Sequence, residues 1–430
     1  MKKVNLSIAG LGNVGSALVY SIENYKSSSL KTNLNLNILG ISAKDQNKER
    51  IFDVKKYKWF DNPKDLIKVE NEKPDILVEL IGNEKGISYE LVRTALLNKI
   101  NVITGNKAML ANHGKELFEI AEKNSVMLLF EAAVAGGIPI IKTIKNNLFS
   151  NKFSKISGIL NGTTNFILTT MENENKDFDD VLADAKLKGF TSDHEAELDI
   201  GGYDAAHKLT LLSTLAFGSE IDFNSNEIQG IENIKIDDIN FAKKLGYRIK
   251  LISESSLIDN KLYASTKPKL ISINKPMANV NDALNAINIQ TDKLDNLYLE
   301  GQGAGGIPTA SSVMSDIFEC FNSSKKQSLA FGVNELKKFD QFDTSQLDSK
   351  YYIRIKVRDK PGVLSKITSY FNESNISIEK ILQLPDESED FIPIIITTHV
   401  VKSLEIIEAV KKIEQFEFVQ EKISLIPIES

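Results

Sequence analysis

Hydrophobic and polar positions alternate in two distinct ways along the first 135 residues. Short β-branched apolar runs are separated by segments whose apolar positions recur at the helical period. This alternation is typical of repeated strand–helix–strand units around a parallel sheet. The expected crossover helices span 87–99 and 109–123. The expected strands span 4–10, 34–42, 75–82, 101–104 and 126–134.

The pattern changes between residues 136 and 301, where longer helical stretches mix with isolated strand-like pieces. We expect helices at 177–188, 204–217 and 239–251, and strands at 156–160 and 262–265. This composition indicates a separate α+β unit. Residues 302–331 are expected to return to the first unit and complete it.

The C-terminal part begins with a polar stretch, 332–350, that lacks periodicity and is predicted to be a linker. Residues 351–430 then follow the order strand, helix, strand, strand, helix, strand. That order predicts a small independent domain. The fold class is therefore α/β at the N-terminus, α+β in the centre and βαββαβ at the C-terminus.

Composition narrows the classes of protein that these units can form. The chain has 430 residues, 42% hydrophobic, and its 58 acidic and 52 basic side chains leave a net charge of −6. Such a balance gives no reason to expect a nucleic-acid partner. The longest apolar stretch is too short and too interrupted to span a membrane. Cys320, the single cysteine, cannot form an internal disulfide, so we expect a cytoplasmic protein.

A glycine-rich motif follows the first expected strand and opens the next expected helix. Gly10, Gly12 and Gly15 have the spacing that permits a tight turn, close approach to a pyrophosphate and close helix packing. Asn13 and Val14 lie where a helix N-terminus would face the anion. The motif predicts dinucleotide binding, and a plain glycine-rich turn is the alternative.

The end of the second strand bears on which dinucleotide is bound. An NAD site usually has a carboxylate there for the ribose hydroxyls, whereas this chain has Ala43 and Lys44, with Asp45 beyond them. Small residues and a cation favour a 2′-phosphate, so NADP is preferred over NAD. Lys44 could equally be a solvated loop lysine.

Three charged residues are candidates for catalysis. Lys107 follows the strand 101–104, at the sheet edge where ligands gather in such folds. Asp204 and Lys208 lie four residues apart and so share one helix face. A carboxylate can position an ammonium as a proton donor to an oxygen. An ordinary helix ion pair is the alternative, and an acidic stretch upstream, 193–199, could bind an ammonium group or be a solvated loop.

Several longer strings resemble the homoserine dehydrogenase family in family order. They are 75–82, 104–108, 131–141, 158–168, 199–208 and 301–313. The resemblance implies a Rossmann-type unit and NAD(P)-dependent interconversion of L-homoserine and L-aspartate 4-semialdehyde in threonine, methionine and isoleucine biosynthesis. It also implies a homodimer or homotetramer. No kinase-like segment precedes the first strand, so we expect a single activity.

The resemblance also implies roles for individual residues. Lys208 and Lys107 would be the catalytic lysines, with Lys208 exchanging the proton at the substrate oxygen and Asp204 holding the substrate. Gly162, Thr163 and Asp199 would contact the substrate, and Thr163 would also contact the nicotinamide. The cofactor would be contacted by Lys107, by the segment that returns at Gly303, and by Ile81 and Gly82. A structural sodium ion would be bound by Glu131 and the carbonyl groups of Val134, Gly136 and Ile138.

One loop departs from the family pattern between Gly189 and Asp199, where the chain is one residue longer and lacks a proline. Counting back from Asp199 places the family's substrate-binding glutamate at Asp193. Glu195 offers the matching side chain at a different position. We therefore expect Asp193 to bind substrate, with Glu195 as the alternative. The altered loop also leaves open another amino-acid semialdehyde as substrate.

The C-terminal unit resembles an ACT domain, a module that binds amino acids at a shared interface. The resemblance places an effector site at Asp359, Gly362, Val363, Leu364, Asn375 and Ile376. Threonine is the effector that the family implies. A non-catalytic sensor of nucleotides and amino acids is the alternative from another class, and the presence of both Lys107 and Lys208 counts against it.

Overall fold

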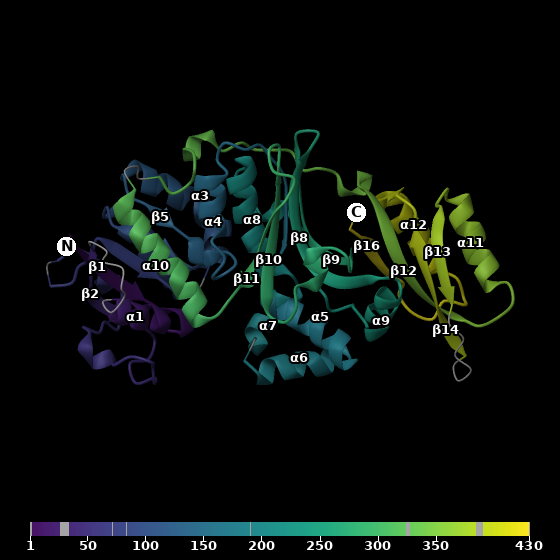
Figure 1. Cartoon of the computed structure of the whole chain (residues 1–430), viewed down its shortest axis with the longest axis horizontal. Helices are drawn as coiled ribbons and strands as arrows, with labels where there is room; N and C mark the ends of the chain where they lie inside the picture. The colour runs from purple at the N-terminus through teal and green to yellow at the C-terminus, as the bar shows by residue number, and fades with distance from the viewer. Residues whose placement is uncertain are drawn as a thin grey trace.

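The computed structural model describes residues 2–25, 34–70, 72–82, 84–189, 191–323, 327–383 and 390–429. Three units lie in a row along the longest axis, from the N-terminal sheet through a central sheet to a C-terminal unit (Figure 1). In these ranges, no helix combines the length and apolarity needed to cross a membrane.

The N-terminal unit is a parallel sheet of five strands in the order β2-β1-β3-β4-β5. The strands are β1 (Lys2–Ala9), β2 (Leu34–Ser42), β3 (Ile76–Glu79), β4 (Asn101–Thr104) and β5 (Leu128–Leu129). Their apolar side chains are mostly buried, as in sheets covered on both faces, and only Leu34, Ile38 and Leu39 of the edge strand β2 are partly buried. The covering helices are α1 (Asn13–Tyr25), α2 (Ile87–Leu97), α3 (Lys107–Lys123) and α10 (Gly306–Asn322), which returns to lie beside α1 (Figure 1).

The expected strand at 126–134 is wrong over most of its length, because β5 contains only Leu128 and Leu129. Glu131–Ala133 form a 3₁₀ turn, and Ala135 and Gly136 both have positive φ. The short helix α4 (Ile140–Lys142) follows, and its backbone N–H groups are bonded by the Glu131 carboxylate. The apolar run is buried, but it forms a turn between two units.

The central unit consists of an antiparallel sheet with helices packed on it. Its strands are β6 (Phe153–Ile159), β8 (Tyr247–Ile258), β9 (Lys261–Ser272), β10 (Leu284–Thr291) and β11 (Leu297–Gln302), with the short β7 (Glu227–Ile228) beside β9. Its helices are α5 (Gly162–Glu174), α6 (Phe178–Leu187), α7 (Asp193–Ile200), α8 (Tyr203–Phe217) and α9 (Ile236–Lys244). The helices expected at 177–188 and 204–217 correspond to α6 and α8.

The helix expected at 239–251 is wrong in its second half. α9 ends at Lys244, and Gly246 turns the chain with φ of 84°. Tyr247 then begins β8, a long strand that pairs with β9. Apolar residues on both sides of Gly246 fit one continuous helical period, but the glycine separates a helix from a strand.

The C-terminal unit has the expected βαββαβ order. It contains β12 (Asp348–Arg358), α11 (Val363–Glu373), β13 (Ile378–Gln383), β14 (Phe391–Thr398), α12 (Ser403–Ile413) and β16 (Ser424–Ile428), with the short β15 (Val401–Lys402) beside β12. β16 also lies parallel to β9, where the Glu429 N–H donates to the Leu270 carbonyl at 2.9 Å. The central and C-terminal sheets are therefore continuous.

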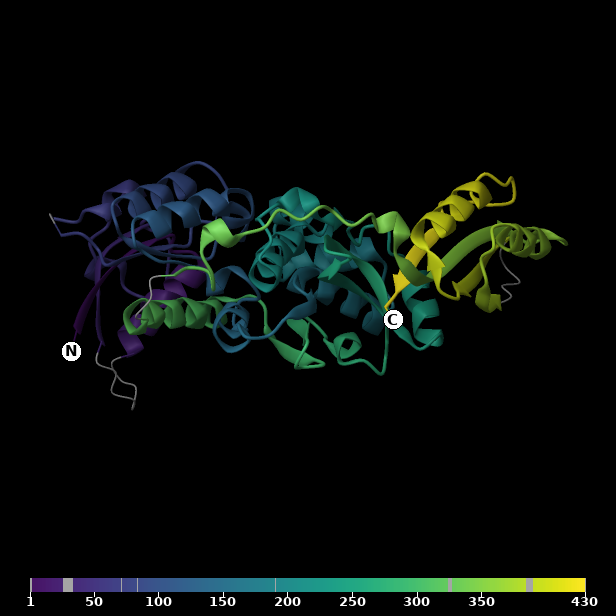
Figure 2. The same cartoon turned by 90° about the horizontal axis from the view of Figure 1, so that it is seen from above.

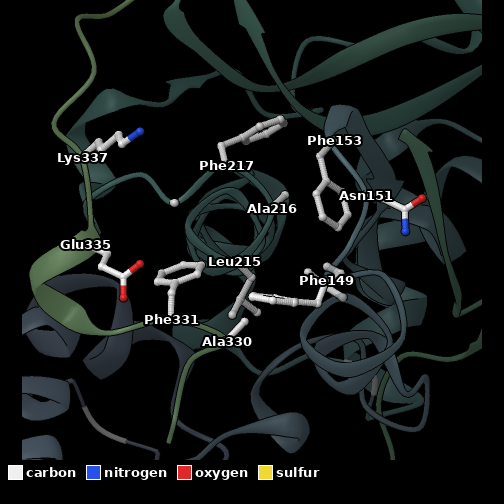
Figure 3. Close-up of a pocket in the computed structure, with 12 residues that line it drawn as sticks. Phe149, Asn151, Phe153, Leu215, Ala216, Phe217, Ala330, Phe331, Glu335 and Lys337 are labelled. Carbon is white, nitrogen blue, oxygen red and sulfur yellow. The ribbon is translucent and has the colours of Figure 1, made fainter. Parts of the chain in front are cut away.

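The segment 332–350, expected as a linker, runs across the central unit (Figure 2). It has no regular period, yet the Lys337 N–H donates to the Gly218 carbonyl at 2.8 Å and the Leu262 N–H donates to the Asp340 carbonyl at 2.8 Å. Beside it lies a cavity of about 310 Å³ at the C-terminal end of α8, lined by four phenylalanines (Figure 3). These are Phe149, Phe153, Phe217 and Phe331. The segment is thus bonded to the central unit along its path.

Candidate active site

The glycine motif forms the turn between β1 and α1. Gly10 has φ of 96°, and a Cβ atom there would lie 2.4 Å from the Leu80 carbonyl group. A Cβ at Gly15 would lie 1.9 Å from the Gly10 carbonyl oxygen, whereas one at Gly12 would meet nothing within 4 Å. Asn13 begins α1 directly after this open position. Space above Gly12 and a helix N-terminus behind it fit a dinucleotide pyrophosphate.

The loop after β3 faces that turn and is held by a buried carboxylate. Glu79 Oε1 accepts hydrogen bonds from the backbone N–H groups of Ile81 and Gly82, at 2.8 and 3.2 Å, and from Ser88 Oγ at 2.6 Å. Its Oε2 accepts from Thr104 Oγ1 at 2.6 Å. Sequence reasoning missed Glu79, although a charged residue inside an apolar strand was a usable signal.

Lys107 is placed by the start of α3. The Asn106 side chain caps this helix by accepting from the Met109 N–H at 3.1 Å. Lys107 is therefore the first helical residue, and its ammonium lies 3.0 Å from Asp204 Oδ1. The structure thus joins Lys107 of the N-terminal unit to Asp204 of the central unit.

Lys208 lies one turn along α8 from Asp204, as the i,i+4 spacing predicted. Its side chain is buried, and its ammonium donates to Asp204 Oδ2 at 2.7 Å and to the Leu160 carbonyl at 2.6 Å. An ammonium group has three N–H donors. One donor therefore remains for a bound oxygen atom.

Asn161 connects the two acidic residues of the site. Its Nδ2 donates to Asp199 Oδ1 at 2.7 Å and to Asp204 Oδ2 at 2.9 Å. Its Oδ1 accepts from the Thr164 N–H at 2.8 Å and so caps α5. Thr191 Oγ1 donates to the second oxygen of Asp199 at 2.9 Å. Asn161 lies in the family string 158–168, which predicted no separate role for it.

The two carboxylates differ in pKa because their surroundings differ. Burial raises the pKa of Asp199, and the neighbouring charge of Asp204 raises it further. Burial would also raise the pKa of Asp204, but the ammonium groups of Lys107 and Lys208 outweigh burial and hold it well below its usual range. Asp204 is therefore ionised at all ordinary pH values.

The remaining expected substrate residues lie near this cluster or outside the described part. Gly162 and Thr163 form the first turn of α5 beside Asn161, and a Cβ at Gly162 would lie 2.6 Å from the Ala283 carbonyl oxygen. The side chains of Asp193 and Glu195 lie outside the described residues. Only the backbone of these two positions is described, as the start of α7.

The other expected cofactor residues lie on both sides of the glycine turn. Ala43 is partly buried and Lys44 is exposed, both just after β2. Gly303 follows β11, and a Cβ there would lie 2.0 Å from the side chain of Asn285. Gly303 also approaches Gly136, where a Cβ would lie 2.5 Å from the Gly303 carbonyl carbon.

The expected sodium ligands gather in the turn before α4. Glu131 is buried, and its two carboxylate oxygens accept from the N–H groups of Ile141 and Lys142 at 2.9 and 3.0 Å. The Gly136 carbonyl accepts from Ser312 Oγ at 2.6 Å. Burial, reinforced by the charge of Asp316, raises the pKa of Glu131 to about 7. A carboxylate and nearby carbonyl groups are hard oxygen donors that suit an alkali cation.

The expected effector residues lie at the start and end of α11. Gly362 precedes the helix with φ of 91°, and Leu364 is exposed in its first turn. Asn375 has φ of 56°, and the Ile376 N–H donates to the Phe371 carbonyl at 2.8 Å. Asp359 and Val363 complete the turn that joins β12 to α11.

A Rossmann-type sheet with an open glycine turn, and with a lysine–aspartate–lysine cluster just after β4, is the arrangement of an NAD(P)-dependent oxidoreductase. Comparison with family models identifies the family within that class. "Homoserine dehydrogenase" matches residues 139–318, "Homoserine dehydrogenase, NAD binding domain" matches 10–131, and "ACT domain" matches 351–418. A homoserine dehydrogenase of Neisseria gonorrhoeae is 34% identical over 437 residues, covering 100% of this chain and 99% of that protein. The chain belongs to the homoserine dehydrogenase family, whose members are NAD(P)-dependent enzymes that act on a CH–OH group.

Solved structures agree with this assignment. A homoserine dehydrogenase from Thiobacillus denitrificans superposes with a TM-score of 0.90 at 33% identity, covering 100% of this chain and 99% of that one. A hyperthermophilic archaeal homoserine dehydrogenase mutant in complex with NADPH gives 0.62 at 30% identity, covering 74% of this chain and 98% of that one. The resemblance, the fold class and the ACT domain expected from the sequence are confirmed.

Proposed function

We propose that Lys208 exchanges the proton at the reacting oxygen when homoserine and aspartate semialdehyde are interconverted. The observation that carries this assignment is the geometry of its ammonium, which uses two donors on Asp204 and the Leu160 carbonyl and keeps one. In the oxidising direction, unprotonated Lys208 takes the hydroxyl proton. In the reducing direction, the ammonium returns that proton to the carbonyl oxygen.

Asp204 and Lys107 support this exchange electrostatically. Asp204 bonds to both ammonium groups, at 3.0 Å from Lys107 and 2.7 Å from Lys208, and so fixes where each points. The remaining donor of Lys208 stabilises negative charge that develops on a substrate oxygen, and the nearby positive charge of Lys107 adds to this stabilisation. Asp204 therefore positions Lys208 and, together with Asp199, lies where a substrate ammonium group can bind.

Substrate recognition belongs to the region around Asn161 in this proposal. Asp199, held by Asn161 and Thr191, supplies a carboxylate for the amino group, with Gly162 and Thr163 beside it. Asp193 remains our first choice for a second acidic contact, and Glu195 our second. Alanine substitution of each, with KM for homoserine measured, distinguishes the two, because only the residue in contact should raise KM.

The cofactor in this proposal is NADP rather than NAD, bound with its pyrophosphate at Gly10, Gly12 and Gly15. Ala43 and Lys44 follow β2 where an NAD site would have a carboxylate. The bound nicotinamide supplies or accepts the hydride. Support comes also from the archaeal family member, whose mutant is described in complex with NADPH.

Substitution of Lys208 tests the catalytic assignment. We expect Lys208→Ala to lower kcat by at least about 10²-fold, while the dissociation constant for NADPH changes less than about threefold. Reduced-cofactor absorbance with homoserine gives kcat, and fluorescence titration gives the dissociation constant. Equal loss of turnover and cofactor binding would indicate misfolding, and an active variant would refute the assignment.

We further propose a structural sodium ion at Glu131, with the carbonyl groups of Val134, Gly136 and Ile138. A buried carboxylate whose pKa is about 7 is charged at pH 8 and gains stability from a bound cation. Replacing choline by sodium at pH 8 should therefore raise the unfolding temperature. The same exchange should have no effect on Glu131→Gln, and an equal effect on both proteins would rule out this site.

Threonine is the effector that we propose for the ACT domain, in an oligomer that is a homodimer or homotetramer in the cytoplasm. The turn at Gly362 and the exposed Leu364 leave the start of α11 accessible. Support for the cytoplasm comes from the single cysteine, buried Cys320, which cannot form an internal disulfide. Asp359→Ala should raise the threonine concentration for half-inhibition more than about tenfold. An unchanged inhibition curve would exclude this site, and light scattering gives the oligomeric state.

A further inference from the structure

We propose that Arg50 is a positioning residue that builds the loop receiving the adenosine 2′-phosphate of the cofactor. The proposal deepens the NADP assignment and therefore rests on the proposed function. Arg50 lies in the segment after β2, outside every motif singled out in the sequence. Its side chain is partly buried against the glycine turn.

The guanidinium of Arg50 is surrounded by backbone carbonyl groups. Its Nε donates to Leu11 O at 3.2 Å, and its Nη2 donates to Asp45 O at 2.6 Å. Its Nη1 donates to Gln46 O at 3.3 Å and to Lys48 O at 2.8 Å. These bonds use four of the five N–H donors of a guanidinium. Arg50 therefore ties residues 45–48 to the glycine turn and keeps one donor.

The opposite side of Arg50 rests on a segment that is paired with the end of β2. The Arg50 guanidinium lies 5.6 Å from the Trp59 ring centre. The Ile41 N–H donates to Lys58 O at 2.9 Å, and the Phe60 N–H donates to Ile41 O at 2.9 Å. Arg50 is thus held between the Trp59 ring of this segment and the Leu11 carbonyl of the glycine turn.

The loop from Ala43 to Arg50 carries two exposed lysines, Lys44 and Lys48, and two exposed carboxylates, Asp45 and Glu49. Of these, Asp45 follows Lys44 directly and accepts from the Asn47 N–H at 2.8 Å through Oδ1, within its own turn. Lys44 is exposed beside it. Because Arg50 fixes the Asp45 carbonyl directly after Lys44, it fixes the backbone from which Lys44 reaches the 2′-position. The fixed positive charge of Arg50 adds to that of Lys44.

Two half-cofactors test the proposal without homoserine turnover. Calorimetry measures the affinities of adenosine 2′,5′-bisphosphate and of 5′-AMP, which differ only in the 2′-phosphate. We expect the unsubstituted protein to prefer the bisphosphate by at least about tenfold and Arg50→Lys to reduce this preference to about threefold or less. A lysine keeps the charge but cannot bond to four carbonyl groups. Lys48→Ala, which removes an exposed cation of the same loop, should keep the preference.

A double substitution shows whether Arg50 acts through Lys44. Lys44→Ala alone should also reduce the preference, and adding Arg50→Lys should reduce it little further, because both changes remove the same interaction. The ratio of the affinities for the bisphosphate and for 5′-AMP does not depend on which fraction of the protein is folded, because both are measured on the same preparation. An unchanged ratio in Arg50→Lys, no preference in the unsubstituted protein, or additive effects would overturn the proposal. If the variants showed the expected preferences for the bisphosphate but the unsubstituted protein did not oxidise homoserine, the proposed function would be refuted and the role of Arg50 would not.

Discussion

Asp204 shows how a single residue acquires its properties from two parts of the chain. Its carboxylate lies between Lys107 and Lys208, and these ammonium groups lower its pKa although burial alone would raise it. Each lysine in turn has a fixed partner. The i,i+4 spacing of Asp204 and Lys208 could be identified in the sequence, but the contribution of Lys107 could not.

Lys250 is a buried cation without an acidic partner at bonding distance among the described residues. Its ammonium donates to Asn165 Oδ1 at 2.9 Å and to the Val280 carbonyl at 2.6 Å. Burial lowers its pKa from 10.5 to about 8. Because each pKa unit is worth about 1.4 kcal/mol, burying the charged form costs on the order of 3 kcal/mol.

This cost predicts a pH dependence of stability. Between pH 8 and 10.5 the unfolded chain binds more protons at Lys250 than the folded chain does, so the free energy of unfolding rises with pH. Below pH 8 both states are protonated and the cost is present in full. Lys250→Met should lack this rise in denaturation experiments at pH 7.5 to 10. Lys243→Met, which removes an exposed lysine, should retain the rise. If the free energy of unfolding changed equally with pH in the unsubstituted protein and in both variants, Lys250 would not be the group responsible.

At the scale of elements, the start of α5 combines a helix cap with a binding site. Asn161 accepts from the Thr164 N–H and donates to both Asp199 and Asp204. One side chain therefore caps the start of α5 and holds two carboxylates of α7 and α8 close together. Asn161 caps the helix through Oδ1 and holds the carboxylates through Nδ2. A substitution that replaces only one of these atoms can therefore change catalysis without changing stability.

Two substitutions separate these roles. Asn161→Ala should lose about 1 kcal/mol of stability with the cap, together with the bonds to both carboxylates. Asn161→Ser should keep the cap, since serine also accepts at this position, but cannot reach the carboxylates. We expect both variants to raise KM for homoserine about tenfold or more, with only the alanine variant less stable. A serine variant with unsubstituted kinetics would show that Asn161 only caps the helix.

At the scale of the whole molecule, a buried ion pair joins the ACT domain to the central unit. Arg354 of β12 donates to Asp238 of α9 at 2.8 Å through Nε and at 3.2 Å through Nη2. Asp238 is fully buried, and Arg354 also bonds Glu421 at 2.6 Å. The pairing of β16 with β9 adds a second connection. Removing residues 351–430 would therefore expose an edge of β9.

Removing the Arg354–Asp238 ion pair should lower the stability of the protein. Arg354→Leu leaves the Asp238 carboxylate buried without its partner, and we expect a loss of about 3–5 kcal/mol in the free energy of unfolding. Lys235→Leu breaks a more exposed ion pair with Glu421 and should cost less than about 1 kcal/mol. Urea denaturation followed by tryptophan and tyrosine fluorescence measures both. Equal, small effects would mean that Asp238 finds other partners.

The sequence by itself determined the features that depend on neighbouring residues. The glycine turn, the order of strands and helices, and the Asp204–Lys208 pair follow from spacing and periodicity along one stretch of chain. The long family strings, including those around Lys107 and Asn161, identified the family as well. The extent of β5 and the end of α9 were misjudged because buried apolar runs look alike in turns, helices and strands.

Only the tertiary structure decided which distant residues meet. Packing of α3 against α8 brings Lys107 to Asp204, and the buried Glu79 joins β3, α2 and β4 into one support. The return of β16 to β9 merges two sheets that the sequence presents as separate. Such contacts depend on the free energy of burying and pairing polar groups in a packed interior, which no local pattern encodes.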